Sequence, residues 1–95
     1  RSAELGKYFL TELKKIKQPL IKDVRGIGLF LGIEFYPEAG GVRKYCEKLL
    51  NEAEIDTGII CKEAHEHVLR LSPPLVIEKK HIDFFVQKFQ KVLKN

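Results

Sequence analysis

The chain has 95 residues, of which 44% are hydrophobic and 32% are charged. This length allows one small domain with a single core, and the composition excludes disordered, collagen-like and membrane-embedded proteins. The formal net charge of +4 at pH 7 could suit an acidic partner. The lysines fall mostly on the expected solvent faces of helices, where they serve solubility, so we expect no nucleic-acid partner.

The sequence also bears on location and completeness. Its longest apolar runs, such as residues 27–33, are interrupted by glycine and are far shorter than the roughly 20 residues of a membrane helix. We therefore expect no membrane partner. The two cysteines do not form the pattern of a disulfide framework, which favours a cytoplasmic setting. The chain contains no methionine and begins at Arg1 inside an expected helix, so residues 1–95 are interpreted as a single domain cut from a longer chain.

Two elements are expected in the first third of the chain. A helical stripe must end near Gln18, because Pro19 follows; its members are Leu5, Phe9, Leu13 and Ile16. From Gly28 to Phe35, large apolar residues alternate with Phe30, Gly32 and Glu34. This period of two predicts a strand with one face on a core.

The remaining elements are a helix, two strands and a last helix. After the breakers at 36–41, helical spacing links Val42, Tyr45, Cys46, Leu49 and Leu50, and Gly58 marks the far end of this helix. Runs 59–62 and 68–71 are prone to form strands and could pair antiparallel, and Pro73 and Pro74 end that ladder. A final helical stripe consists of Ile82, Phe85, Val86, Phe89, Val92 and Leu93.

This order of elements predicts an α+β fold in two layers, a small, largely antiparallel sheet covered by helices. Few residues in it point to chemistry. His65 and His67 could share one face of a strand, but no further ligand lies at a suitable spacing, so we expect no metal site. Cys46 and Cys61 lie where thiols usually behave as small buried hydrophobes, and we expect neither to be a nucleophile.

Arg70 is the side chain that we single out. Its neighbours Leu69 and Leu71 should face the core, so Arg70 should point the other way, just before the rigid pair Pro73-Pro74. There it could present a planar fork to a carboxylate, although the pattern alone favours an ordinary exposed arginine. Gly26 and Gly28 are interpreted as allowing a tight turn or a close backbone approach at the strand entrance.

Two segments of the chain resemble class III aminotransferases. Residues 23–29 (DVRGIGL) with 32–34 (GIE) resemble the first small-domain strand of that family. Residues 70–75 (RLSPPL) look like its segment that carries the substrate-carboxylate arginine. Residues 61–65 (CKEAH) are more similar to the bacterial ornithine branch than to the acetylornithine or 4-aminobutyrate branches. The chain departs from the family at 51–58, which is several residues longer than the usual brief glycine turn.

The resemblance implies the C-terminal small domain of a fold-type I enzyme that transfers the δ-amino group of ornithine to 2-oxoglutarate through a lysine-bound pyridoxal 5′-phosphate. Arg70 would bind a substrate carboxylate, and five residues would be structural: Arg25, Gly26, Gly28, Pro73 and Pro74. The family's cofactor-binding residues belong to its large domain and have no match here, so the chain alone should be inactive. The implied partners are amino-acid and 2-oxo-acid substrates, that large domain and a second subunit of a homodimer.

Two other classes of function stay open. One is a free-standing α+β binding module for RNA or a regulatory small molecule. An RNA-binding sheet would need exposed aromatic residues on its strands, but only Phe30 has the parity opposite to Leu31 and Ile33. A purely structural or dimerisation domain would leave Arg70 without a role.

Overall fold

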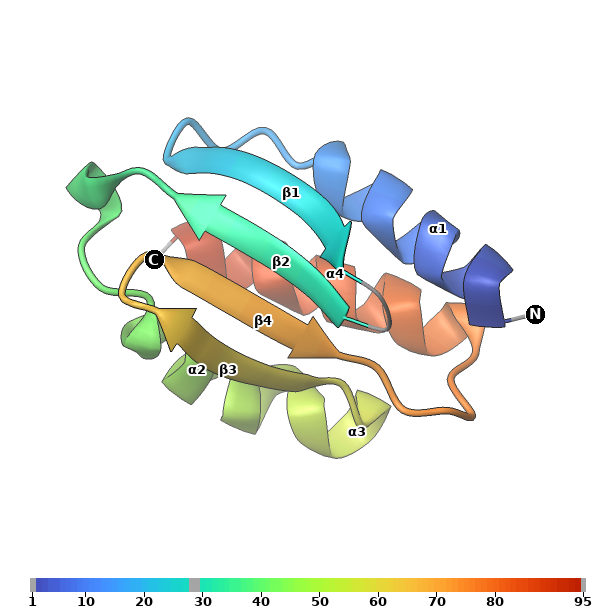
Figure 1. Ribbon diagram of the computed structural model, residues 1–95. Coiled ribbons are helices and arrows are strands. Elements are labelled where there is room, and N and C mark those ends of the chain that lie inside the picture. Colours follow the sequence, from blue (N-terminus) through green and yellow to red (C-terminus); the bar gives the residue numbers. More distant parts are fainter. Residues whose placement is uncertain (1, 28–29, 95) are drawn as a thin grey trace.

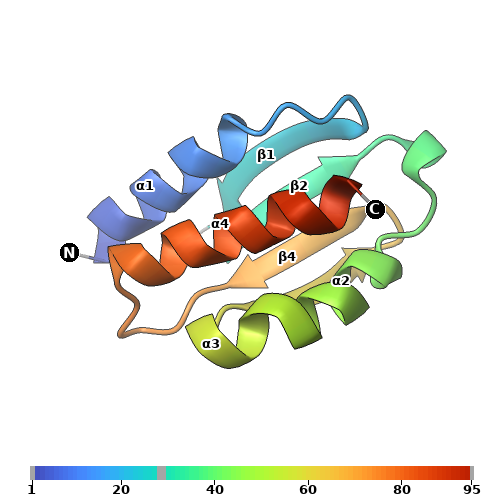
Figure 2. The same ribbon diagram turned by 180° about the vertical axis from the view of Figure 1, so that it is seen from behind.

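The computed structural model describes residues 2–27 and 30–94 (Figure 1). Its strands pair antiparallel throughout, in the order β1-β2-β4-β3; they are β1 (Ile21–Ile27), β2 (Phe30–Phe35), β3 (Ile60–His65) and β4 (Val68–Ser72). Helices α1 (Ser2–Lys14), α2 (Arg43–Leu49) and α4 (Lys79–Lys94) cover one face of this sheet and leave the other open (Figure 2). The predicted α+β fold with a small antiparallel sheet under helices is confirmed.

Strand β1 is absent from the elements that the sequence pattern predicts. It lies at the edge of the sheet, and its pairing with β2 shifts register between Ile21 and Asp23. Only Val24 gives it a deeply buried side chain among residues 21–26. An edge strand with charged side chains and an irregular register has no clean apolar alternation, which is why the pattern missed it. The expected strand at 28–35 is β2, whose first two expected residues lie outside the described ones.

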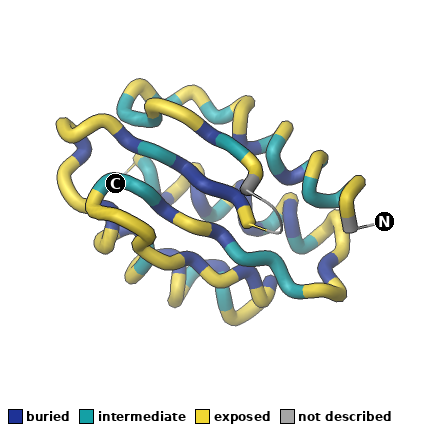
Figure 3. The backbone as a smooth tube through the Cα atoms, in the orientation of Figure 1, coloured by how far each residue is buried: buried dark blue, intermediate teal, exposed yellow. Residues whose placement is uncertain are grey.

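The core lies between the sheet and the helices. In β2 the residues Leu31, Ile33 and Phe35 are at most 5% exposed, and in β4 Leu69 and Leu71 are fully buried. Figure 3 shows the buried residues along these central strands and on the inner sides of the helices. The helices contribute large apolar side chains that are also fully buried, including Phe9, Leu13, Leu49, Ile82, Phe85 and Phe89. The helical stripes expected for the first and last helices therefore face this core.

Helices α1 and α4 run side by side on the sheet (Figure 2). The rings of Phe9 and Phe85 meet edge to face with their centroids 5.7 Å apart. The Tyr8 hydroxyl donates to the Asp83 carboxylate, and this hydrogen bond raises the pKa of Tyr8 to about 12. Helix α1 ends at Lys14, four residues before the expected end at Gln18. Within residues 2–27 and 30–94, no helix combines the length and apolar character that crossing a membrane requires.

The middle helical segment continues beyond α2. A π-helical turn, η2 (Leu50–Glu54), and a short α-helical turn, α3 (Ile55–Thr57), extend it to Gly58. The long connection noted at 51–58 is therefore a helical extension. Leu50, expected on the buried stripe, is 53% exposed, because the wider π-helical turn begins there and breaks the 3.6-residue period.

Gly58 ends this helical segment in the left-handed conformation, with φ of 73°. A Cβ atom at position 58 would lie 3.3 Å from Cγ of Pro74, the second of the two prolines that follow β4. Thr57 is buried beside it; its hydroxyl donates to the Ala53 carbonyl and accepts from the Ile59 amide. The glycine thus allows both the sharp helix end and the close packing of the segment after β4.

Gly58→Ala is expected to lower the free energy of unfolding of the 95-residue chain by about 1–2 kcal/mol, because alanine resists the left-handed conformation. The matched control is Gly6→Ala in α1, where a Cβ would meet no atom within 4 Å. Alanine should there raise stability by up to about 1 kcal/mol. Urea unfolding measures both changes, and equal effects of the two substitutions would contradict this account of Gly58.

Candidate functional site

The open face of the sheet carries a row of basic side chains from three of its four strands. Arg25 on β1 pairs with Gly32 on β2, Gly32 pairs with Arg70 on β4, and Arg70 pairs with Lys62 on β3. Arg70 points away from the buried side chains of Leu69 and Leu71, as the sequence pattern predicts. Gly32 has no side chain and is buried, so the two arginines lie on either side of it in the register.

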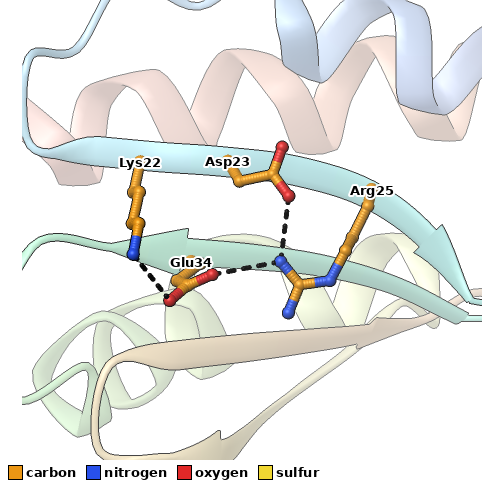
Figure 4. A network of polar contacts seen from close by, with 4 residues as sticks. All are labelled: Lys22, Asp23, Arg25 and Glu34. Carbon is orange, nitrogen blue, oxygen red and sulfur yellow. Dashed lines mark hydrogen bonds and ion pairs between the residues drawn. The ribbon is translucent and has the colours of Figure 1, made fainter.

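The charge of Arg25 is balanced within the sheet (Figure 4). Its Nη1 atom lies 3.0 Å from an oxygen of Asp23 and 3.2 Å from one of Glu34, and Lys22 also lies 3.7 Å from Glu34. Asp23 and Glu34 are opposite each other in the register, and such like charges repel unless a cation lies between them. Hydrogen bonds to Asp23 and then to Glu34 raise the pKa of Arg25. These ion pairs support the predicted structural role of Arg25.

Arg70 has a different environment from Arg25. Its Cζ atom lies 5.2 Å from the ring centroid of Phe30, which is 40% exposed on the same face. No carboxylate of the described residues lies within ion-pair distance of Arg70. The guanidinium is therefore supported on an aromatic ring and keeps its donors available for an external carboxylate.

The alternation of apolar residues in the sequence does not predict a role for Phe30. It shares the outward parity of Gly32 and Glu34, but its contact with Arg70 depends on β2 lying beside β4, a pairing between distant segments. Phe30 and Phe35 are the only Phe, Tyr or Trp residues in the described strands, and Phe35 is buried. The open face therefore lacks the set of exposed rings that RNA-binding sheets use.

Of the glycines and prolines in the expected motifs, Gly26 lies in β1, and Pro73 and Pro74 follow β4. A Cβ at Gly26 would make only ordinary contacts with Leu10 and Leu31, and Gly26 lies inside β1 without a positive φ. The interpretation that it permits a tight turn or a close approach is thus wrong for Gly26, and Gly28 lies outside the described residues. Pro73 and Pro74 follow the end of β4 at Ser72, as expected.

The remaining candidates lie away from the row. His65 ends β3, and His67 sits in the turn after it, with Nδ1 3.2 Å from the Gly40 carbonyl oxygen. Residues 2–27 and 30–94 include no group of three or more His, Cys, Asp or Glu that could hold a metal ion. Cys61 is buried and Cys46 is half-buried, with their sulfur atoms 3.4 Å apart.

The sequence model of the class-III aminotransferases matches residues 1–93, so the chain belongs to this family. It is 52% identical over 94 residues to an ornithine aminotransferase of Halalkalibacterium halodurans, covering 99% of this chain and 22% of that protein. It is 47% identical over 95 residues to an ornithine aminotransferase of Bacillus subtilis, covering 100% of this chain and 22% of that protein. The chain thus spans about a fifth of the length of these relatives.

Solved structures of the same class share this fold. An ornithine aminotransferase from Plasmodium yoelii superimposes with a TM-score of 0.75 at 36% identity, over 98% of this chain and 24% of that one. An acetylornithine aminotransferase from Elizabethkingia anophelis gives a TM-score of 0.77 at 29% identity, over 98% of this chain and 24% of that one. Both the ornithine and the acetylornithine branches therefore contain this arrangement of strands and helices.

The contact between Phe30 and Arg70 is testable by a double-mutant cycle with Phe30→Leu and Arg70→Gln. The coupling free energy should be about 0.5–1 kcal/mol, because the pair is partly exposed to solvent. The control cycle combines Phe30→Leu with Lys62→Gln and should show coupling near zero. Urea unfolding of the 95-residue chain gives each value; equal coupling in both cycles would refute a specific contact with Arg70.

Proposed function

We propose that residues 1–95 form the C-terminal small domain of a longer pyridoxal-phosphate-dependent aminotransferase, which transfers the δ-amino group of ornithine to 2-oxoglutarate. Membership of the class-III family supports the reaction type, and the relatives named ornithine aminotransferase support the amino donor. Glutamate semialdehyde and glutamate would be the products.

In this proposal Arg70 binds a carboxylate of the amino-acid or 2-oxo-acid substrate. The single observation that carries it is the exposed guanidinium, which has an aromatic support and no carboxylate partner among the described residues. A bidentate pair between arginine and a carboxylate fixes both the position and the orientation of the substrate. Arg25, held by Asp23 and Glu34, is less suited to that role.

The cofactor would be held by another part of the longer protein. A lysine that attaches pyridoxal phosphate needs a desolvated environment that favours the neutral amine. None of the described lysines is buried, so none fits this requirement. When bound, the cofactor supplies the electron sink of transamination, and this chain contributes a carboxylate-binding arginine.

The open face of the sheet also suggests where the rest of the enzyme lies. Its helical face already forms the core, whereas the opposite face is uncovered (Figure 1). Arg70 lies on that second face, because Leu69 and Leu71 point into the core. We infer that the large domain approaches this second face and encloses the substrate there, with a homodimer as the full-length assembly. The location expected for this enzyme is the cytoplasm, where a reducing environment keeps thiols free.

Arg70→Ala in the full-length protein should lower kcat/KM for ornithine or 2-oxoglutarate by about 100-fold, as expected for the loss of a charged hydrogen-bonding partner. Single-turnover kinetics of the two half-reactions identifies which substrate is affected. With an amine donor that lacks a carboxylate, the donor half-reaction should be unchanged.

The matched control is Arg43→Ala on α2, another exposed arginine whose partner Glu63 lies on the helical side of the sheet. It should leave both half-reactions within about twofold of the unmodified enzyme, as for other exposed pairs. Equal losses with and without a substrate carboxylate would refute the assignment of Arg70.

The choice of amino donor separates ornithine aminotransferase from the other class-III branches. We expect kcat/KM to be highest for ornithine in a panel with N-acetylornithine and 4-aminobutyrate. Borohydride reduction and peptide mapping should place the cofactor on a lysine outside residues 1–95. A preference for another donor would assign the protein to the acetylornithine or 4-aminobutyrate branch. Cofactor attached to a lysine of residues 1–95 would contradict the proposal that another part of the protein holds it.

A further inference from the structure

Two thiols meet at the edge of the sheet opposite to β1. Cys46 lies on α2 and Cys61 on β3, 15 residues apart in the chain, and their sulfur atoms are 3.4 Å apart. Neither takes part in the row of Arg25, Arg70 and Lys62 on the open face. The contact joins a helix of the covering layer to the edge strand β3.

The segments that carry the two thiols are fixed against each other. The Cys61 amide donates to the Glu54 carboxylate at 3.2 Å, which ties β3 to the π-helical turn after α2. Arg43 at the start of α2 also pairs with Glu63 on β3 at 3.2 Å. The sulfur atoms must approach by about 1.4 Å to reach the disulfide bond length of about 2.0 Å, a movement within the reach of side-chain rotation.

The two cysteines have unequal surroundings. Cys61 is only 6% exposed, whereas Cys46 is half-buried and reaches the surface. The hydrogen bond between the thiols lowers the pKa of Cys46 and raises that of Cys61, and burial raises it further. Cys46 is thus the more accessible sulfur and the one at which the thiolate is favoured, and Cys61 lies buried behind it.

We propose that Cys46 and Cys61 are a reversible dithiol–disulfide pair, in which a small peroxide oxidises Cys46 and Cys61 then closes the disulfide. This inference does not rest on the proposed aminotransferase activity. It assigns a modification site that ties α2 covalently to the β3–β4 hairpin, and Arg70 lies on the second strand of that hairpin opposite Lys62.

The chemistry balances with hydrogen peroxide as the oxidant. The Cys46 thiolate attacks one peroxide oxygen, the O–O bond breaks, and the hydroxide that leaves takes up a proton to become water. The resulting sulfenic acid is attacked at sulfur by Cys61, which loses its proton; an S–S bond forms and a second water leaves. Two thiols and one peroxide give one disulfide and two waters, and a dithiol reductant reverses the oxidation.

The test uses the full-length protein, reduced and then treated with hydrogen peroxide. Remaining thiols are alkylated before digestion with trypsin, which separates residues 45–48 from residues 49–62 because cleavage follows Lys44, Lys48 and Lys62. We expect mass spectrometry to find these two peptides joined, with the loss of two hydrogens, and dithiothreitol to separate them. In the reduced protein, iodoacetamide should modify Cys46 on the order of ten times faster than Cys61.

Two variants separate the roles of the cysteines. Cys61→Ala removes the second thiol, so Cys46 should accumulate as sulfenic acid, trapped by dimedone, and proceed to sulfinic acid. Cys46→Ala should leave the buried Cys61 unmodified at the same peroxide dose. Circular dichroism checks that each variant is folded. If a variant does not fold, the disulfide-linked peptides of the unmodified protein still test the proposal.

Some outcomes would overturn the proposal. One is a folded protein whose Cys46 and Cys61 both stay reduced at a dose that oxidises a synthetic peptide of residues 45–48. Another is Cys46 reaching sulfinic acid with Cys61 present and no linked peptide. A disulfide that joins only separate molecules would likewise show that the two sulfurs do not react with each other.

Discussion

The burial of Leu69 and Leu71 in the central strand β4 is the constraint on which the rest of the structure depends. Both side chains are fully buried on the helical side of the sheet, and alternation along a strand then places Arg70 on the opposite face. A slip of one residue would expose the leucines and bury the charge of Arg70, at a large cost in free energy. The same alternation that closes the core therefore fixes the candidate site.

The charged residues of the open face divide into two groups. Arg25 serves the sheet itself, because it neutralises two carboxylates that would otherwise repel each other across β1 and β2. Arg70 rests on the Phe30 ring and forms no ion pair with a carboxylate among the described residues. Exposed ion pairs contribute little to stability, so the difference between the arginines matters mainly for binding. In the proposed function the open face would orient an anionic substrate, and none of the described lysines is buried as covalent chemistry would require.

Under the proposed function, the chain would be one contributor to an active site that needs more residues than it contains. It spans about a fifth of its ornithine aminotransferase relatives, and its rigid sheet suits the positioning of a carboxylate. The helical extension through η2 and α3 and the pair Cys46 and Cys61 lie together at the β3 edge. This edge adjoins the strand that carries Arg70, because Lys62 on β3 pairs with Arg70 on β4.

By itself the sequence determined the two long helices, the central strands and the outward direction of Arg70, since periodicity reports directly which face of an element is buried. Its resemblance to class III aminotransferases was confirmed by comparison. The sequence pattern did not predict strand β1, because an edge strand with an irregular register forms through its pairing with β2. The support of Arg70 by Phe30, the π-helical break at Leu50 and the meeting of Cys46 with Cys61 were decided only by tertiary structure. Each depends on segments far apart in the chain coming into contact, which no local pattern records.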